Sequence, residues 1–157
     1  MARSFLIMVA LLVTACGGSG APSGPASNDP VDVDPETAEL WGGWATEART
    51  IASVTRQLYN TGSMRPEQAS SLRTQAEELA QEIRAAEPAS GQVLQLADDL
   101  DELAGRLEFG IEYARNSGLP VINIVLPGLP DAYSNLAEHA FSLSETLGVT
   151  EPSPTPP

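Results

Sequence analysis

The sequence contains no lysine, a single cysteine and a single histidine. The absence of lysine excludes Schiff-base chemistry and any phosphate-binding loop that depends on a lysine. One cysteine cannot form a disulfide within the chain, so the fold must be stabilised by packing. One histidine cannot supply the two that a di-iron helical bundle requires. The composition therefore excludes lysine-dependent chemistry, an intrachain disulfide and a di-iron site of the bundle type.

Basic residues are also few: 8 Lys and Arg residues stand against 21 acidic residues, and the net charge is −13. A field of this sign repels the phosphate backbone, so nucleic-acid binding lacks its usual driving force. It also repels anionic lipid headgroups. We therefore expect no nucleic-acid partner, and we expect any attachment to a membrane to use something other than the protein surface.

The first sixteen residues form a distinct leader. Arg3 is followed by an apolar run over residues 5–13 and then by two small residues before Cys16. This order of charged, apolar and small residues is typical of a secretory signal peptide. The apolar run has about half of the ~20 residues that a membrane-spanning helix needs. The sequence therefore predicts a signal peptide over residues 1–15.

The residues Val13-Thr14-Ala15-Cys16 resemble the lipobox of bacterial lipoproteins. The resemblance implies cleavage before Cys16, a diacylglycerol group on its sulfur and a fatty acid, such as palmitate, on the new amino terminus. Two or more acyl chains, at ~0.8 kcal/mol per buried methylene, anchor a protein stably. Because Gly17 follows the cysteine, the resemblance favours the outer membrane in a host that has one, and otherwise the outer face of the cell membrane.

Flexible segments flank the central part of the chain. Residues 16–34 hold the lipidated cysteine and are rich in Gly, Ser, Pro and Asp, so we expect a disordered tether with a root-mean-square span of about 20–25 Å. Residues 150–157 form a short Pro-rich tail that we also expect to be disordered. One domain remains, over residues 35–149, and it is long enough to bury a core.

Four stretches of this domain carry apolar residues at helical spacing. Each apolar stripe is one-sided, and the two short connections make consecutive helices antiparallel neighbours. The sequence therefore predicts an all-α, up-down-type four-helix bundle. Leu40, Trp41 and Trp44 are expected in its core, and Gly42-Gly43 is expected to delay the regular first helix until Trp44. The predicted helices run from Pro35 to Asn60, from Pro66 to Ala86, from the residue after Ser90 to Ser117, and from Pro130 to Leu147.

One apolar segment, LPVINIVLPGL over residues 119–129, has no helical period and is interrupted by prolines. We expect it to be an extended crossover that lies against the bundle. Phe109 and Tyr113 lie toward the outer face of the third helix, and we expect the segment to cover them. Two alternatives stay open: a partner protein covers them, or they are singly exposed residues of the kind common on protein surfaces. The candidate partner surface consists of Phe109, Tyr113, Val121, Ile122 and Ile124.

Other polar residues give weaker signals. His139 lies at the edge of the fourth stripe, where a packed or solvated role is expected, although haem held by His139 and Met64 is an alternative. An acidic cluster on the third helix spreads around the helix instead of converging on an ion, so we expect a solvated face and no metal or cofactor. Its members are Asp98, Asp99, Asp101 and Glu102.

These observations predict an exported, lipid-anchored helical bundle that acts as a non-catalytic protein-binding or cell-envelope structural module. Two other functions stay open. The bundle could hold a small ligand such as haem between its helices. A pair of carboxylates could also hydrolyse a substrate, because two acids suffice for that chemistry, but the sequence selects no pair.

Overall fold

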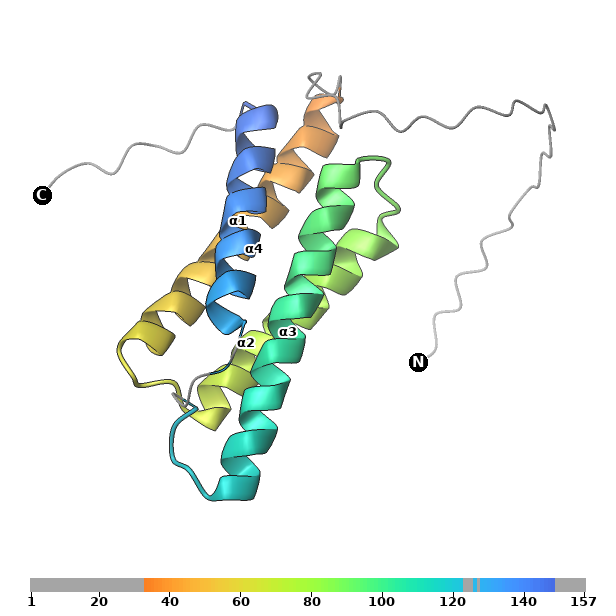
Figure 1. Ribbon diagram of the computed structural model, residues 1–157. Coiled ribbons are helices and arrows are strands. Elements are labelled where there is room, and N and C mark those ends of the chain that lie inside the picture. Colours follow the sequence, from red (N-terminus) through yellow and green to blue (C-terminus); the bar gives the residue numbers. More distant parts are fainter. Residues whose placement is uncertain (1–32, 123–125, 127, 149–157) are drawn as a thin grey trace, which may run out of the picture.

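Four α-helices account for most of the described chain (Figure 1). The computed structural model describes residues 33–122, 126 and 128–148. No strand occurs among these residues, and the predicted four-helix bundle is confirmed. The helices are α1 (Pro35–Asn60), α2 (Pro66–Ala85), α3 (Gly91–Ser117) and α4 (Leu129–Thr146).

The ends of the helices follow local signals in the sequence. The carboxylate of Asp34 accepts a 3.0 Å hydrogen bond from the backbone N–H of Thr37, which caps α1, and Pro35 occupies its first position. Gly118 ends α3 in the left-handed conformation, with φ of 64°. The expected delay at Gly42-Gly43 is wrong, because α1 is continuous from Pro35. The two glycines cost about 2 kcal/mol of helix propensity, which the cap and the buried tryptophans beside them offset.

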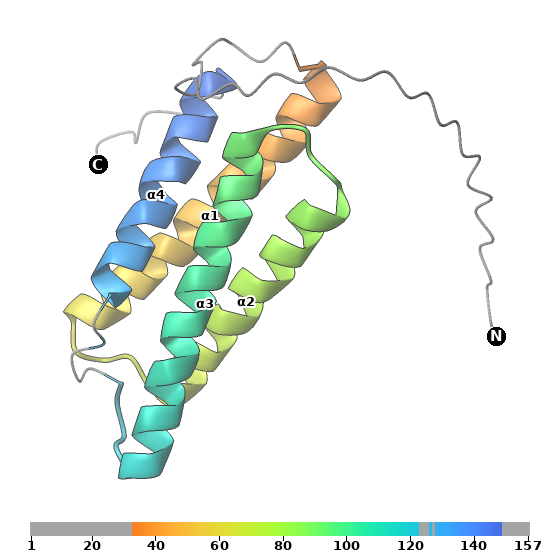
Figure 2. The ribbon, with the colours of Figure 1, turned by 45° about the vertical axis from the view of Figure 1, so that its right-hand side comes forward.

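The helices follow one another in up-down order (Figures 1 and 2). α2 packs most extensively on α3, and α1 packs mainly on α4. α3 and α4 complete the ring of contacts, whereas α1 and α2 touch over a much smaller area. The bundle therefore consists of two closely packed helix pairs with one open seam, between α1 and α2.

The predicted apolar stripes form a continuous core through the bundle. Trp41 and Trp44 are both buried, and Nε1 of Trp44 donates a 2.9 Å hydrogen bond to Glu82 across the α1–α2 seam. The expectation for Leu40 is wrong, because its side chain is exposed. Leu40 and Trp41 differ by about 100° on the helix, so only one of them can face the core. The largest fully buried side chains include Ile51, Ile83, Leu96, Leu100, Leu103, Leu107, Leu136 and Leu143.

The segment between α3 and α4 runs back along the last turns of α3, which project beyond the start of α4 (Figures 1 and 2). Ile122 and Leu126 are buried there against Gly110, whose missing side chain leaves room for them. The backbone N–H of Ile122 also donates a 2.8 Å hydrogen bond to the carbonyl of Met64, in the loop between α1 and α2. Ile122 and Leu126 of the predicted crossover thus lie against α3 at Gly110.

The described chain begins and ends at the same end of the bundle. α1 starts and α4 finishes there, while the projecting end of α3 lies at the opposite end (Figure 1). Within the described ranges, no helix combines the length and the hydrophobicity that crossing a bilayer requires. The predicted signal peptide, the lipidated Cys16 and the Pro-rich tail lie outside the described residues.

Candidate functional site

Two exposed aromatic side chains stand on the projecting end of α3. Phe109 is 57% exposed and Tyr113 is 46% exposed. They are four residues apart, so they are neighbours on one face of the helix. The expectation that residues 119–129 cover them is wrong, because that segment packs on the Gly110 side of the helix. We call Phe109 and Tyr113 the aromatic pair.

The other predicted members of the partner surface have different environments. Ile122 is only 3% exposed, so its side chain is not open to a partner, and this part of the prediction is wrong. Val121, which precedes it, is half-buried. Ile124 lies outside the described residues. The structure thus leaves Phe109 and Tyr113 as the exposed apolar part of the predicted surface.

Carboxylates flank the aromatic pair on α3. Glu112 lies one position before Tyr113 and is exposed. Glu108 lies one position before Phe109 and accepts a 2.9 Å hydrogen bond from Nη1 of Arg73 on α2. A partner of the aromatic pair would therefore meet apolar surface beside negative charge.

A buried acid bound to the histidine is the main feature that the sequence did not predict. Asp99 on α3 is 5% exposed, so its assignment to a solvated face is wrong. Its Oδ1 accepts a 3.1 Å hydrogen bond from Gln95, and its Oδ2 accepts one from Nδ1 of His139 on α4. The spacing of Asp99 from Leu96 and Leu103, three and four residues away, is the signal that places it on the buried arc of α3.

The other three acids of the cluster, Asp98, Asp101 and Glu102, are exposed as predicted. The predicted i,i+4 pair between Glu102 and Arg106 is confirmed at 3.2 Å. These carboxylates face water and arginines, whereas a catalytic acid needs an apolar pocket that keeps it protonated at neutral pH. Asp98, Asp101 and Glu102 therefore form a solvated face, whereas Asp99 is buried.

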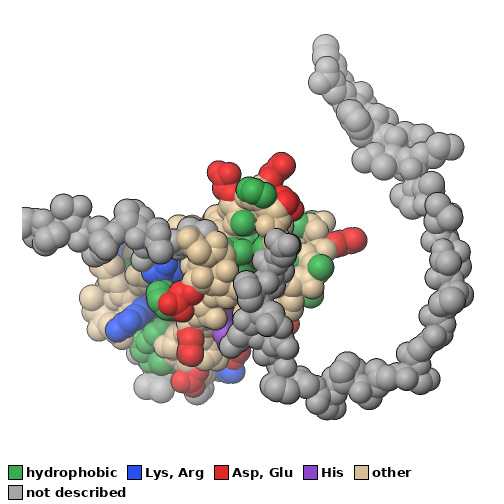
Figure 3. All heavy atoms as spheres, turned by 90° about the horizontal axis from the view of Figure 1, so that it is seen from above, with side chains coloured by type: hydrophobic (Ala, Val, Ile, Leu, Met, Phe, Trp, Pro, Cys, Tyr) green, Lys and Arg blue, Asp and Glu red, His purple; other side chains and the backbone are tan. Residues whose placement is uncertain are grey.

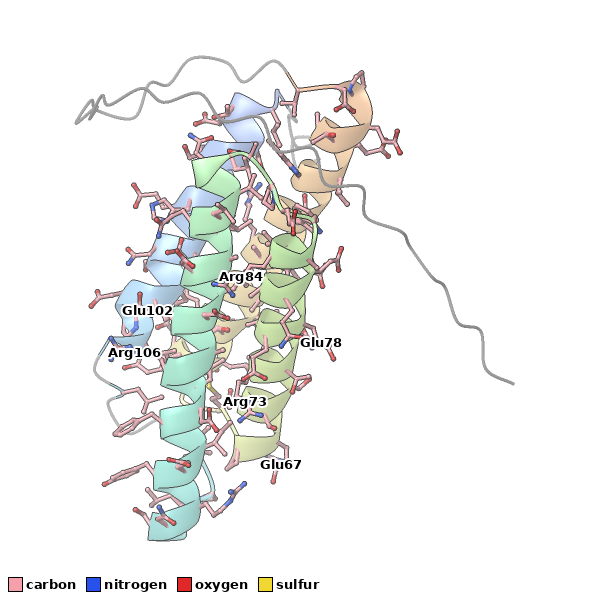
Figure 4. All side chains as sticks on the ribbon, turned by 90° about the vertical axis from the view of Figure 1, so that its right-hand side faces the viewer. Glu67, Arg73, Glu78, Arg84, Glu102 and Arg106 are labelled. Carbon is pink, nitrogen blue, oxygen red and sulfur yellow. The ribbon has the colours of Figure 1, made fainter. Side chains whose placement is uncertain are left out.

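Ion pairs connect the exposed faces of α2 and α3. Arg84 reaches from α2 to Asp98 at 2.8 Å and to Asp101 at 2.6 Å. The hydrogen bonds from Arg84 to Asp98 and then to Asp101 raise the pKa of Arg84 above its ordinary value. Arg73 and Arg84 lie between the two helices, whereas Glu67 and Glu78 project from α2 away from α3 (Figure 4). Because these pairs are exposed, each contributes little to stability.

The residues weighed for haem do not come together. Met64 is buried in the core near Ile122, at the level of Gly110 on α3, whereas His139 is bound at the level of Asp99. Eleven residues of helix separate these two levels, which corresponds to about 16 Å. Met64 and His139 cannot be axial ligands of one haem at that separation. Nor do any three His, Cys, Asp or Glu side chains of the described residues lie close enough to hold a metal ion.

The described part of the bundle thus offers the exposed aromatic pair on α3, a further exposed aromatic residue, Phe141, on α4, a buried carboxylate bound to an exposed imidazole, and a mostly acidic exterior. Comparison of the chain with protein-family models, with curated proteins and with solved structures finds no match in any of the three. The functional argument therefore depends on the residues themselves.

Proposed function

We propose that the chain is an exported bacterial lipoprotein, anchored in a membrane through lipid on Cys16, whose helical bundle acts by binding another protein. In this proposal the bundle carries no catalytic activity of its own. Residues 17–34, which are rich in Gly, Ser, Pro and Asp, connect Cys16 to the start of α1. In this proposal the lipid anchor holds the protein at the membrane, and the bundle binds the partner protein.

The leader supports the first half of the proposal. It combines Arg3, an apolar run too short to span a bilayer and small residues before the only cysteine. A free thiol in an exported protein is reactive or forms bridges between molecules. Lipid attachment to Cys16 removes that reactivity, and the composition of the mature chain, with no lysine and many acids, offers no electrostatic route to the membrane.

The aromatic pair is the observation that carries the second half. Phe109 and Tyr113 are 57% and 46% exposed, and the segment best placed to cover them packs elsewhere. They stand on the projecting end of α3, opposite the end at which the chain enters α1 (Figure 1). A tether that holds the start of α1 near a membrane leaves this surface facing outward. Exposed aromatic residues are typical of the central contacts of protein interfaces.

The anchor is tested by replacing Cys16 with serine. We expect the parent protein to incorporate a labelled fatty acid and to fractionate with membranes. The Cys16→Ser protein should incorporate no label and accumulate with its leader attached. Equal processing and equal fractionation of the two proteins would contradict the lipoprotein assignment.

The binding function is tested by replacing Phe109 and Tyr113 with serine, in single variants and together. Because both side chains are exposed, we expect the folded state to be nearly unaffected. Aromatic residues at the centre of an interface contribute about 2 kcal/mol or more to the binding free energy, which corresponds to about thirtyfold in affinity. When crosslinked partners are purified from membranes of the source organism, we therefore expect at least about thirtyfold less partner with the double variant than with the parent protein.

Leu94→Ser is the matched control, because Leu94 is an exposed apolar residue near the other end of α3. It should leave the recovery of the partner unchanged. If both the parent and the double serine variant recover the same proteins, the aromatic pair is not the binding surface.

A further inference from the structure

A groove lies along α1 at its open seam with α2. It has a volume of about 860 Å³, and it follows one face of α1 from Pro35 to Ile51, with Gln75 of α2 on the opposite wall. Sixteen residues of helix correspond to a length of about 24 Å. α1 and α2 are the neighbouring helices with the smallest contact, so this groove is where the bundle is least closed on itself.

The floor of the groove consists of small side chains. Ala38, Gly42, Thr46 and Thr50 follow one another at intervals of four residues, so they lie in line along α1. Gly43 lies beside them, and a β-carbon added there would meet no atom within 4 Å. Small residues in line allow a second helix to approach closely, because the distance between packed helices depends on the side chains at the contact. The length and the floor both suit a helix of about four turns.

The charges that line the groove are all negative. Glu39 and Glu47 stand along it, and no basic residue lines it. A neighbouring hollow continues this surface with the exposed Leu40 and with Glu36 and Glu82. Figure 3, viewed from the end at which α1 begins, shows acidic side chains beside hydrophobic ones at this end of the bundle.

The basic residues of α1 lie on its other flank. Arg49 and Arg56 line a neighbouring hollow together with Tyr133 of α4, and this hollow shares Thr46 and Thr50 with the groove. Arg49 also stacks over the ring of Phe141 on α4, 5.7 Å from its centre. α1 therefore presents an acidic flank toward the groove and a basic flank toward α4. Glu39 and Glu47 are the charged residues that line the groove itself, and Arg49 borders it beyond Thr46 and Thr50.

We infer that this groove binds an amphipathic helix that has an apolar face and basic edges. The apolar face would lie on the small residues of α1, and the basic edges would meet Glu39 and Glu47. This inference goes beyond the proposed function, since it concerns a second surface near the tethered end and names the chemistry of its partner. Recognition of an amphipathic helix by an apolar groove is a recurring mode of peptide binding.

Charge disfavours two other occupants of the groove: the chain's own terminal segments, and a second copy that packs symmetrically, groove to groove. Residues 17–34 contain three acids and no base, and residues 150–157 contain one acid and no base. A second copy that packs groove to groove would place the same acidic flank against Glu39 and Glu47. Each of these occupants would bring like charges together, which disfavours binding.

The test uses the chain from residue 17 to 157 and a synthetic peptide of about 16 residues, with leucines on one helical face and lysines on the other. Binding is measured by fluorescence anisotropy at about 50 and about 300 mM salt. One control peptide has glutamate in place of every lysine, and a second has the same composition in scrambled order. We expect the amphipathic basic peptide to bind more tightly than either control, and to bind less tightly at the higher salt concentration.

Two glycine substitutions locate the binding site. Gly43→Leu fills the groove, and Gly105→Leu is the matched control on α3, where a β-carbon also meets no atom within 4 Å. We expect Gly43→Leu to weaken binding at least about tenfold and Gly105→Leu to leave it unchanged. Replacing both Glu39 and Glu47 with glutamine should weaken binding and reduce its salt dependence. The glutamine variant decides the outcome if Gly43→Leu does not fold.

Several results would overturn the inference. Equal binding to the parent and to Gly43→Leu would place the peptide elsewhere, and equal binding of the glutamate peptide would exclude a basic partner. Self-association of the parent that Gly43→Leu abolishes would make the groove an interface between copies. Binding that is at least about tenfold tighter after removal of residues 17–32 would make the tether the occupant. None of these results bears on Phe109 and Tyr113, so failure here is distinct from failure of the proposed function.

Discussion

Replacing Gly110 with alanine should destabilise the bundle, although the same change usually stabilises a helix. A β-carbon at Gly110 would lie 2.5 Å from Cγ2 of Ile122 and 2.7 Å from Cδ1 of Leu126. Leu126 can rotate the end of its side chain away. Ile122 cannot move as easily, because it branches at its β-carbon and its backbone is hydrogen-bonded to Met64. The segment between α3 and α4 must therefore shift.

The size of the effect follows from a comparison with Gly105, which lies on the same helix in open space. Gly105→Ala should increase the free energy of unfolding by up to about 1 kcal/mol, which is the difference in helix propensity. Gly110→Ala gains the same propensity but forces an overpacked contact that costs about 1–3 kcal/mol. Because the propensity terms cancel, the difference between the two variants measures the packing cost alone, and we expect about 1–3 kcal/mol.

Urea unfolding followed by circular dichroism measures both variants. A double variant refines the comparison: Ile122→Ala should destabilise the Gly110→Ala protein less than it destabilises the parent, because the two residues are in contact. If Gly110→Ala stabilises the protein as much as Gly105→Ala does, Ile122 and Leu126 do not pack on α3, and the account of this segment is wrong.

Two further predictions concern charged groups. His139→Ala should lower the free energy of unfolding by about 1–2 kcal/mol, because it removes the hydrogen-bond partner of the buried carboxylate of Asp99. Asp99→Leu in the same background should recover part of this loss. Equal stability of His139→Ala and the parent in urea would contradict the prediction. The backbone N–H and then the hydroxyl of Thr37 hold the pKa of Asp34 below its ordinary value, so this carboxylate stabilises the fold above pH ~4 and loses that contribution as the pH falls through its folded pKa. Asp34→Ala should therefore make the loss of stability in acid shallower, and an unchanged slope of stability against pH would argue against the cap.

The helices could be predicted because their ends depend on nearby residues. Asp34 and Pro35 start α1, and Gly118 ends α3, through interactions within a few positions of the chain. The one-sided stripes then require four helices to pack together. The prediction for Gly42-Gly43 was wrong because propensity acts locally, whereas Trp41 and Trp44 hold this part of α1 against the rest of the bundle.

The candidate site was harder to predict because it depends on which elements meet. Asp99 and His139 are 40 positions apart, and a helical wheel gives the face of each residue but not the partner across the bundle. In the same way, the pattern placed Phe109 on an outer face and identified an apolar segment nearby. It did not show that Gly110 would receive Ile122 and Leu126 and so leave the aromatic pair exposed. The residues that resemble a lipobox, Val13 to Cys16, are the reverse case, since a short local motif predicts a location for the protein and nothing about the bundle.

The most direct measurement of the central claim is site-specific photo-crosslinking at position 109 in cells that produce the full-length chain. If the anchored bundle binds another protein through the aromatic pair, a crosslinker at position 109 should give a discrete adduct in the membrane fraction. The same crosslinker at position 94 should not give that adduct, and Tyr113→Ser should weaken it. The absence of an adduct at position 109, or identical adducts at positions 109 and 94, would contradict the account.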